Sequence, residues 1–331
     1  MRVMVTGACG VNGVWVVREL LERGHEVVAV DRVPDGAAPP GAGAPYRFEP
    51  ADVRDTARLA RMVREQRYDA IVHLAALVGY PGGRADPKLA FEVNVGGTIA
   101  VLEAAVVGDV RRVVFASSKA AYGEVGGAHA RPTYAPVAED HVGRPLPPSF
   151  LSVYAASKLA SEQLGINYHA AFGVQFAALR FARICAPGKL TTRHGPMSID
   201  SRMIEDAARG VPTVIPRGGD ERDDIVYVRD VARSFAHALE ADGLGAGVYN
   251  IGQGRPFALG DVADAVRRRI PGARIEIGPG HDFLGLGFSV YSVFDIGRAR
   301  RELGFEPAWD LDAMVGDYLR TIEAEGAPRA P

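Results

Sequence analysis

Cysteine is scarce in this sequence: Cys9 and Cys185 are the only two among 331 residues. They lie far apart and form no C-x-x-C pair, which argues against a disulfide framework and a zinc knuckle. A chain with so little cysteine is typical of a reducing compartment. We therefore expect a cytoplasmic protein.

The sequence also lacks a marked charge excess and long apolar runs. Its 38 basic and 40 acidic residues give a formal net charge of −2, so nothing draws the whole molecule to nucleic acid or an anionic membrane. The apolar start ends at Gly7, which is too early for a signal peptide. No run of 18 apolar residues predicts a membrane span. We expect neither a nucleic-acid nor a membrane partner.

Strand and helix patterns alternate through the first half of the chain. Strands separated by helices form a parallel sheet with helices on both faces, so we expect an α/β fold of the doubly wound Rossmann type. A stretch rich in glycine, proline and alanine at 35–45 predicts a surface loop. The predicted strands are 3–5, 26–30, 70–74, 112–116 and 174–180, and the predicted helices are 14–23, 58–66, 90–106 and 153–172.

Proline and glycine interrupt this pattern after about residue 185. The second half predicts a smaller C-terminal α/β lobe that leans over the open end of the sheet. We divide the chain into residues 1–185 and 186–331, and expect it to cross between the two parts more than once. Helices are predicted in the lobe at 199–209, 228–239, 259–270 and 296–303.

A glycine-rich turn joins the first predicted strand to the first predicted helix. Residues 6–13 read T-G-x-x-G-x-x-G. The glycines of such a turn permit a tight bend, a close approach of the backbone to a pyrophosphate, and close packing of helix on strand. The diphosphate lies at the helix N-terminus, where free N–H groups favour negative charge. The predicted contacts in the turn are Gly7, Gly10, Val11, Asn12 and Gly13.

Asp31 ends the second predicted strand. A carboxylate there accepts hydrogen bonds from the ribose hydroxyls of a dinucleotide and repels a 2′-phosphate. We therefore predict NAD as the cofactor. Arg32 is also predicted to contact the cofactor. It slightly weakens the preference for NAD over NADP, because an arginine next to the acidic residue can bind the 2′-phosphate of NADP.

Tyr154 and Lys158 form a Y-x-x-x-K pair on a predicted helix. Residues four apart share a helix face, so the Lys158 ammonium can lower the pKa of the Tyr154 hydroxyl from about 10. Such a phenol can act as a general acid/base on a substrate hydroxyl. A solvated helix face gives the same pattern, so the pair needs further support.

That support comes from several motifs that keep one order along the chain. With the glycine turn and the Tyr154/Lys158 pair, they make the chain resemble the extended short-chain dehydrogenase/reductases, in their NAD-dependent epimerase/dehydratase branch, from residue 2 to about residue 315. The motifs are A-D-V-R-D at 51–55, H-L-A-A at 73–76, N-V-G-G-T at 94–98, S-S-K-A-A-Y-G at 117–123, R-D-D-I-V-Y-V-R-D-V-A at 222–232, Y-N-I-G at 249–252 and A-R-R-E-L-G-F at 299–305.

The resemblance implies roles at the matching positions. Ser118 completes a triad with Tyr154 and Lys158, and its hydroxyl can hold the reacting substrate oxygen while Tyr154 takes the proton. Residues 1–185 would then bind NAD and carry the triad, and residues 186–331 would mainly bind substrate. The other implied cofactor positions are Asp52 and Val53 at the adenine, Leu74, Ala75 and Ala76 along the channel, Asn94 beside the active-site helix, and Tyr154 and Lys158.

The two residues after Ser118 narrow the reaction. In the family that the chain resembles, dehydratases carry Asp-Glu at these two positions, and sugar-acid decarboxylases carry Glu at the second. This chain has Lys119 and Ala120 there. We therefore expect an NAD-dependent sugar 4-epimerase that works through a transient ketone. The alternative is an NAD-dependent sugar or sugar-acid dehydrogenase that releases NADH. A non-catalytic dinucleotide sensor, which has no need of the triad, is the third possibility.

The substrate side departs from the family pattern. Arg222 matches a position that meets the substrate diphosphate, but residues 278–282 read G-P-G-H-D where a second diphosphate-binding arginine is usual. Arg183 replaces an asparagine; its guanidinium suits a carboxylate or phosphate, or it is salt-bridged within the protein. We expect a nucleotide sugar or an anionic sugar. The predicted substrate contacts are Ser118, Lys119, Arg183 and Arg222.

Two further expectations concern assembly and metals. The family commonly forms a homodimer through helices equivalent to those predicted at 90–106 and 153–172, so the resemblance implies a homodimer. The sequence has no H-E-x-x-H and no histidine pair four apart on a helix, so no metal site is predicted. We expect His73, at the end of a strand, to be structural.

Overall fold

The core of the protein is a parallel sheet. The computed structural model describes residues 1–33, 45–78, 86–144, 153–188 and 198–325. Seven strands lie in the order β11-β6-β5-β4-β1-β2-β3, and each neighbouring pair is parallel. The order reverses between β1 and β4, which is where such sheets bind ligands. The strands are β1 (Arg2–Thr6), β2 (Glu26–Asp31), β3 (Tyr46–Pro50), β4 (Ala70–His73), β5 (Arg112–Ala116), β6 (Gln175–Phe181) and β11 (Ala246–Ile251).

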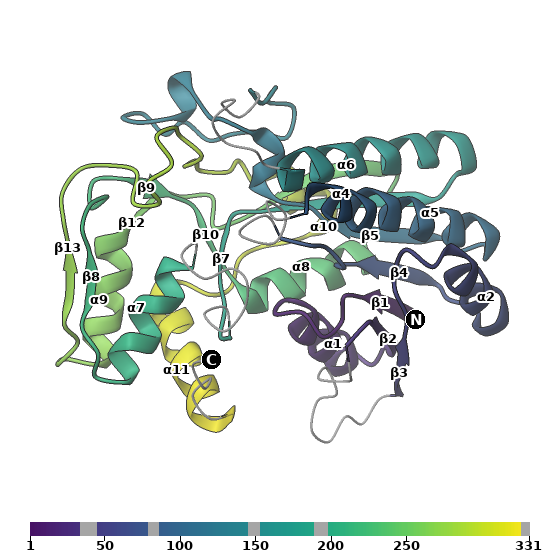
Figure 1. Cartoon of the computed structure of the whole chain (residues 1–331), viewed down its shortest axis with the longest axis horizontal. Helices are drawn as coiled ribbons and strands as arrows, with labels where there is room; N and C mark the ends of the chain where they lie inside the picture. The colour runs from purple at the N-terminus through teal and green to yellow at the C-terminus, as the bar shows by residue number, and fades with distance from the viewer. Residues whose placement is uncertain (34–44, 79–85, 145–152, 189–197, 326–331) are drawn as a thin grey trace.

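Helices cover both faces of this sheet (Figure 1). Alternate residues of β5 point to opposite cores, because successive side chains of a strand leave opposite faces. Val113 packs in one core with Leu59 and Leu102 of the helices, and Val114 packs in the other. The doubly wound Rossmann-type prediction is confirmed. One face carries α2 (Thr56–Gln66), α5 (Gly97–Val107) and α6 (Val153–Phe172), and the other carries α1 (Gly13–Glu22) and α8 (Val228–Glu240).

The predicted helix at 90–106 is longer and has an irregular middle. It runs as α4 (Pro87–Phe91), a π-helical turn (Glu92–Gly96) and α5. By length and composition, Pro87–Val107 is the one membrane-length apolar helix in the described parts of the chain, but 61% of its apolar window is buried inside the protein. Packing in the core against α2 and α6 therefore accounts for its apolar character.

The second half of the chain builds the smaller lobe and also returns to the sheet. Strand β11, α8 and α10 (Gly297–Leu303) pack with the main sheet. Most of the other elements form the lobe at the end of Figure 1 opposite α2, and β7 and β10 lie between this lobe and α8. The predicted α/β lobe is confirmed. All of the predicted loop at 35–45 except Pro45 lies outside the described residues. The lobe contains α7 (Ile199–Ala208), α9 (Leu259–Arg269) and α11 (Leu311–Glu325), with paired strands β7 (Arg183–Cys185) and β10 (Ile225–Tyr227), β8 (Thr213–Ile215) and β13 (Ile275–Ile277), and β9 (Arg222–Asp223) and β12 (Phe257–Ala258).

Both tryptophans of the chain meet at one arginine. The Arg229 guanidinium of α8 lies 4.8 Å from the ring centre of Trp15 on α1 and 5.6 Å from that of Trp309. Its Nε also lies 2.5 Å from the carboxylate of Asp317 on α11. Cation–π contacts and an ion pair thus tie the helix after the glycine turn to the C-terminal helix.

Candidate active site

The glycine turn lies where the strand order reverses. Gly7 has φ +72°, and a Cβ on it would lie 2.5 Å from the backbone N of Ala75, which follows β4. A Cβ on Gly13 would lie 2.2 Å from the Gly7 carbonyl oxygen. Side chains at these positions would fill the cradle between β1 and β4. Asn12 precedes α1 without a side-chain cap, which leaves the helix N-terminus suited to a diphosphate.

Asp31 is held beside this turn. Its Oδ2 accepts a hydrogen bond from the Cys9 N–H at 3.0 Å, and its Oδ1 accepts one from the Arg32 N–H at 2.7 Å. The carboxylate is therefore oriented at the end of β2, next to the glycine cradle. This combination fits a dinucleotide with free ribose hydroxyls.

The remaining predicted cofactor positions surround the same sheet edge. Asp52 pairs with Arg54 at 2.7 Å, and hydrogen bonds from Arg54 keep the pKa of Asp52 below its usual value. Val53 is buried against the start of α5, where a Cβ on Gly97 would lie 2.8 Å from its Cγ2. Half-buried residues 74–76 follow β4 directly.

Asn94 connects this edge to α6, the helix that contains Tyr154 and Lys158. Its Oδ1 accepts from the Leu77 N–H at 2.7 Å, and its Nδ2 donates to Ser157 Oγ at 3.0 Å. The π-helical turn turns Asn94 inward, as such turns often do at functional sites. Because Ser157 precedes Lys158, Asn94 fixes α6 relative to the segment after β4.

His73 is structural, as predicted. Its Nδ1 lies 2.7 Å from Thr6 Oγ1 and its Nε2 lies 3.2 Å from Thr98 Oγ1. Burial lowers the pKa of His73 to about 3, so the imidazole stays neutral at physiological pH and links β1, β4 and α5.

The structure brings Ser118, Tyr154 and Lys158 together. Ser118 follows β5 and caps the short turn η2 (Lys119–Tyr122), its Oγ accepting from the Ala120 N–H at 3.2 Å. The Ser118 side chain lies close enough to the Tyr154 hydroxyl to oppose the rise in the pKa of Tyr154. Lys158 donates from Nζ to the Ala116 carbonyl oxygen at 2.6 Å, and Nζ lies 5.4 Å from the Tyr154 ring centre. A polar group able to hold a substrate oxygen thus lies beside a phenol and a buried amine.

The prediction that Lys158 lowers the pKa of the Tyr154 hydroxyl is wrong for the protein without a bound cofactor. Burial raises the pKa of Tyr154 above its usual value, and the Ser118 side chain opposes this. Burial also lowers the pKa of Lys158 to about 7, against the attraction of Glu162. The Lys158 ammonium lies over the rings of Phe115 and Tyr154 and bonds to a carbonyl, and it does not bond to the phenol oxygen.

A buried ion pair behind the triad was not predicted. Glu162 is fully buried on α6 and holds Arg180 of β6 through two hydrogen bonds, at 2.6 and 2.9 Å. Ser117, next to Ser118, donates to the same carboxylate. Glu162 is four residues after Lys158, and this helical spacing was the available signal.

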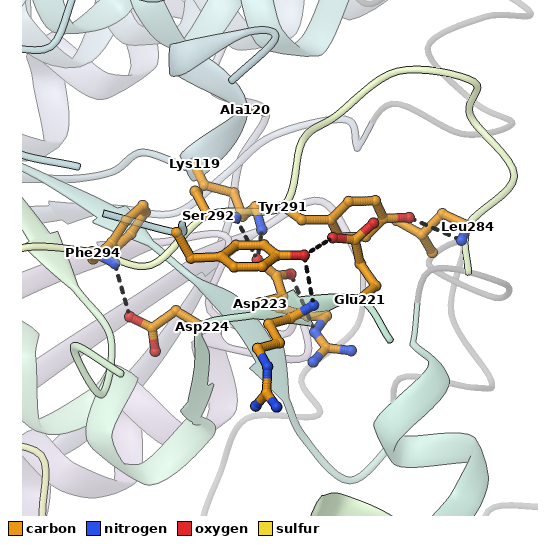
Figure 2. A network of polar contacts seen from close by, with 12 residues as sticks. Lys119, Ala120, Glu221, Asp223, Asp224, Leu284, Tyr291, Ser292 and Phe294 are labelled. Atoms are coloured by element: carbon orange, nitrogen blue, oxygen red, sulfur yellow. Dashed lines mark hydrogen bonds and ion pairs between the residues drawn. The ribbon is translucent and has the colours of Figure 1, made fainter. Parts of the chain in front are cut away.

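Arg183 lies in an ion-pair cluster with Lys119. Figure 2 shows Lys119 reaching Asp223 of β9, with Nζ 2.5 Å from Oδ1. Arg183, only 9% exposed, lies 3.4 Å from Asp223 Oδ2 and 3.2 Å from Asp200 Oδ2. The structure thus shows Arg183 in an internal salt bridge, and its predicted contact with substrate stays a prediction.

Arg222 and residues 278–282 lie on the substrate-lobe side of this cluster. The Arg222 side chain is exposed, while its N–H donates to the Tyr134 hydroxyl at 3.3 Å. The neighbouring Glu221 accepts from the Asp282 N–H at 3.0 Å. A hydrogen bond from its backbone to the Glu221 carboxylate thus holds the G-P-G-H-D segment beside Arg222.

Comparison with known proteins decides the family. The model of the NAD-dependent epimerase/dehydratase family matches residues 3–252. The chain belongs to this family. A UDP-glucose 4-epimerase from Lacticaseibacillus casei is 30% identical to this chain, and the match covers 95% of both chains.

Solved structures agree along the whole chain. The UDP-glucose 4-epimerase of Thermotoga maritima, solved with UDP-glucose, matches with a TM-score of 0.81 and 25% identity over 98% of this chain and 100% of that one. The UDP-glucose 4-epimerase of Thermus thermophilus, solved with NAD, matches with a TM-score of 0.77 and 32% identity over 97% and 99%. The predicted enzyme class and NAD dependence are confirmed. NAD supplies a hydride acceptor when it is bound.

Proposed function

We propose that this enzyme is a nucleotide-sugar 4-epimerase. The observation that carries the proposal is the Ser118, Tyr154 and Lys158 constellation at the edge of the glycine cradle. Lys119 and Ala120 follow Ser118, so this turn supplies no carboxylate for loss of water or of carbon dioxide. The relatives named UDP-glucose 4-epimerase support the same reaction.

The triad supports a reversible oxidation at C4 of the sugar. Ser118 Oγ would hold the C4 oxygen, and Tyr154, ionised beside the Lys158 ammonium, would take the hydroxyl proton. Bound NAD would accept the C4 hydrogen as hydride. The resulting ketone would rotate within the site, so that the hydride returns to its other face and Tyr154 gives the proton back to the oxygen. Lys158, with a pKa of about 7, supplies positive charge next to the phenol.

We propose a neutral hexose as the sugar. The charge of Arg183 is already balanced by Asp200 and Asp223, so a sugar carboxylate would add an unbalanced negative charge to this buried cluster. The exposed Arg222 side chain is available for the diphosphate. UDP-glucose and UDP-galactose are therefore the first substrates to test.

The assembly is proposed on the same basis. Residues 1–185 hold NAD and the triad, and residues 186–331 mainly hold the substrate. Large apolar side chains are exposed along α4, α5 and α6, at Phe91, Ile99 and Leu159, which supports a homodimer through these helices. We place the enzyme in the cytoplasm.

A two-sided assay tests the function. Purified protein receives UDP-glucose or UDP-galactose, and both sugars and NADH absorbance are followed. Interconversion from either side to one equilibrium without accumulating NADH supports the epimerase. Accumulating NADH indicates a dehydrogenase, and NAD binding without turnover indicates a sensor. The variant Tyr154→Phe is the control, and should bind NAD while losing turnover.

A further inference from the structure

An ion pair joins the catalytic turn to the substrate lobe. Lys119 follows Ser118 in η2, and its Nζ lies 2.5 Å from Oδ1 of Asp223 in β9. The two side chains are 17% and 2% exposed, so water screens the pair weakly. The contact spans 104 positions in the sequence, and it connects the residue beside the triad to the strand that also contains Arg222.

Asp223 is a fixed anchor. Besides Lys119, its Oδ1 accepts a hydrogen bond from the Ser292 N–H at 3.0 Å, as Figure 2 shows. Its Oδ2 faces Arg183 at 3.4 Å, and Arg183 in turn faces Asp200 at 3.2 Å. Two cations and two carboxylates thus alternate in a balanced cluster, and neither Asp223 oxygen can move without breaking a contact.

The turn held by this anchor is short. η2 contains four residues and begins from extended backbone at Ser118, with φ −158° and ψ 152°. Helical turns of this length have few internal hydrogen bonds and weak geometry. A tether one residue from Ser118 therefore limits how far its hydroxyl can move from Tyr154.

We propose that Lys119 is a positioning residue, which through Asp223 holds the Ser118 hydroxyl against Tyr154 and couples the substrate lobe to the catalytic turn. The proposal rests on the proposed function in one respect: Ser118 is taken to hold the reacting sugar oxygen. Lys119 then contributes to turnover without touching the substrate.

The variant Lys119→Met has a side chain only slightly shorter than lysine and removes its charge. Small displacements of catalytic groups cost up to roughly 100-fold in rate, so we expect kcat to fall roughly 10- to 100-fold with little change in KM. The Ser118 side chain opposes the rise in the pKa of Tyr154. Weakening this effect should raise that pKa further and move the limb of the pH–rate profile assigned to Tyr154 toward higher pH, as in Ser118→Ala.

A matched control separates positioning from stability. Arg229→Met breaks a different ion pair, the one between Arg229 and Asp317 at 2.5 Å, which tethers the C-terminal helix. Neither residue of this pair belongs to the triad. The variant should lower the melting temperature and leave the pH–rate profile of the folded enzyme unchanged. Lys119→Arg should restore most of kcat. If Lys119→Met behaves like Arg229→Met, with unchanged kcat and pH profile per folded molecule, the positioning role is refuted.

A second readout does not need turnover. The protein is labelled with ¹³Cζ-tyrosine and saturated with NAD, and the Tyr154 signal is assigned by its loss in Tyr154→Phe. A higher Tyr154 pKa in Lys119→Met than in wild type supports the proposal, and an equal pKa overturns it. Because this titration works even if no sugar nucleotide is turned over, it separates failure of the inference from failure of the proposed function.

Discussion

Lys158→Met should make the protein more stable while it abolishes turnover. The Lys158 amine is buried next to the Tyr154 ring, and burial lowers its pKa from 10.5 to about 7. Keeping an ammonium at this position opposes folding. Methionine has a similar length and carries no charge, so it removes this opposition together with the amine that we propose to take part in turnover.

The magnitude follows from the pKa. A difference of one pH unit corresponds to about 1.36 kcal/mol, so the charge costs about 5 kcal/mol of folding free energy below pH 7. The lost hydrogen bond to the Ala116 carbonyl oxygen, at 2.6 Å, offsets about 1–3 kcal/mol of this gain. We expect a net gain of about 2–4 kcal/mol, which is several degrees in melting temperature.

The stability gain of Lys158→Met should depend on pH in a definite direction. The folded-state pKa of Lys158 lies below the unfolded-state value, so between about pH 7 and pH 10.5 the unfolded chain binds a proton that the folded chain lacks. The cost is fully present below about pH 7 and fades as the pH rises toward 10.5. The stability gain of Lys158→Met should therefore be largest at pH 7 and should shrink at pH 9.

Urea unfolding at both pH values measures this effect. The protein must first be freed of dinucleotide, because a ligand stabilises the folded state by mass action. Lys88→Met is the control, because the Lys88 side chain is 86% exposed and its charge is screened by water. A Lys158→Met variant less stable than wild type at pH 7, or one with the same difference at pH 7 and 9, would refute this reasoning.

Three further perturbations probe the cradle, the buried pair and the joint between the lobes. Gly13→Ala should weaken NAD binding at least roughly tenfold in calorimetry, since its Cβ would lie 2.2 Å from the Gly7 carbonyl oxygen. The control Gly260→Ala, whose Cβ meets nothing within 4 Å, should bind NAD as wild type does. Glu162→Gln should lose about 3–5 kcal/mol in urea unfolding, because the buried Arg180 loses its counter-charge; a loss below about 1 kcal/mol would contradict the role of this pair. Arg229→Met should shift the tryptophan emission spectrum, since Arg229 contacts both Trp15 and Trp309, and an unchanged spectrum would argue against this joint.

Local patterns were sufficient for most of the sheet and its helices. The strand 112–116 and the helix 153–172 have the predicted bounds, because each combines a clear apolar pattern with clear ends. Strand β3 was not predicted. It is the edge strand, only one of its five residues is buried, and it therefore lacks the apolar run that marks the inner strands.

Helix α11 and all strands after β6 were also missed. Helix α11 had a readable signal, since the buried residues Leu311, Met314, Val315, Tyr318 and Ile322 recur at helical spacing. Strand β11 had a weaker signal because Asn250 interrupts its apolar run. The structure explains this buried amide, whose Nδ2 donates to the Val137 carbonyl oxygen at 2.8 Å.

The candidate site divides in the same way. The glycine turn, Asp31 and the Tyr154/Lys158 pair could be predicted because their geometry depends on neighbours within one turn or at one strand end. The Lys119, Asp223, Arg183 and Asp200 cluster could not, since only the folded chain brings these positions together. The pKa directions of Tyr154 and Lys158 likewise depend on burial from several elements.

The fate of the hydrogen at C4 is the most direct test of the proposed epimerase. UDP-glucose deuterated at C4 is incubated with the enzyme in ordinary water, and the UDP-galactose formed is analysed by NMR and mass spectrometry. We predict that the product keeps its deuterium at C4 and that no NADH accumulates, because the hydrogen removed from one face returns to the other. Ordinary hydrogen at C4 of the product, or a ketone released together with NADH, would contradict the proposal.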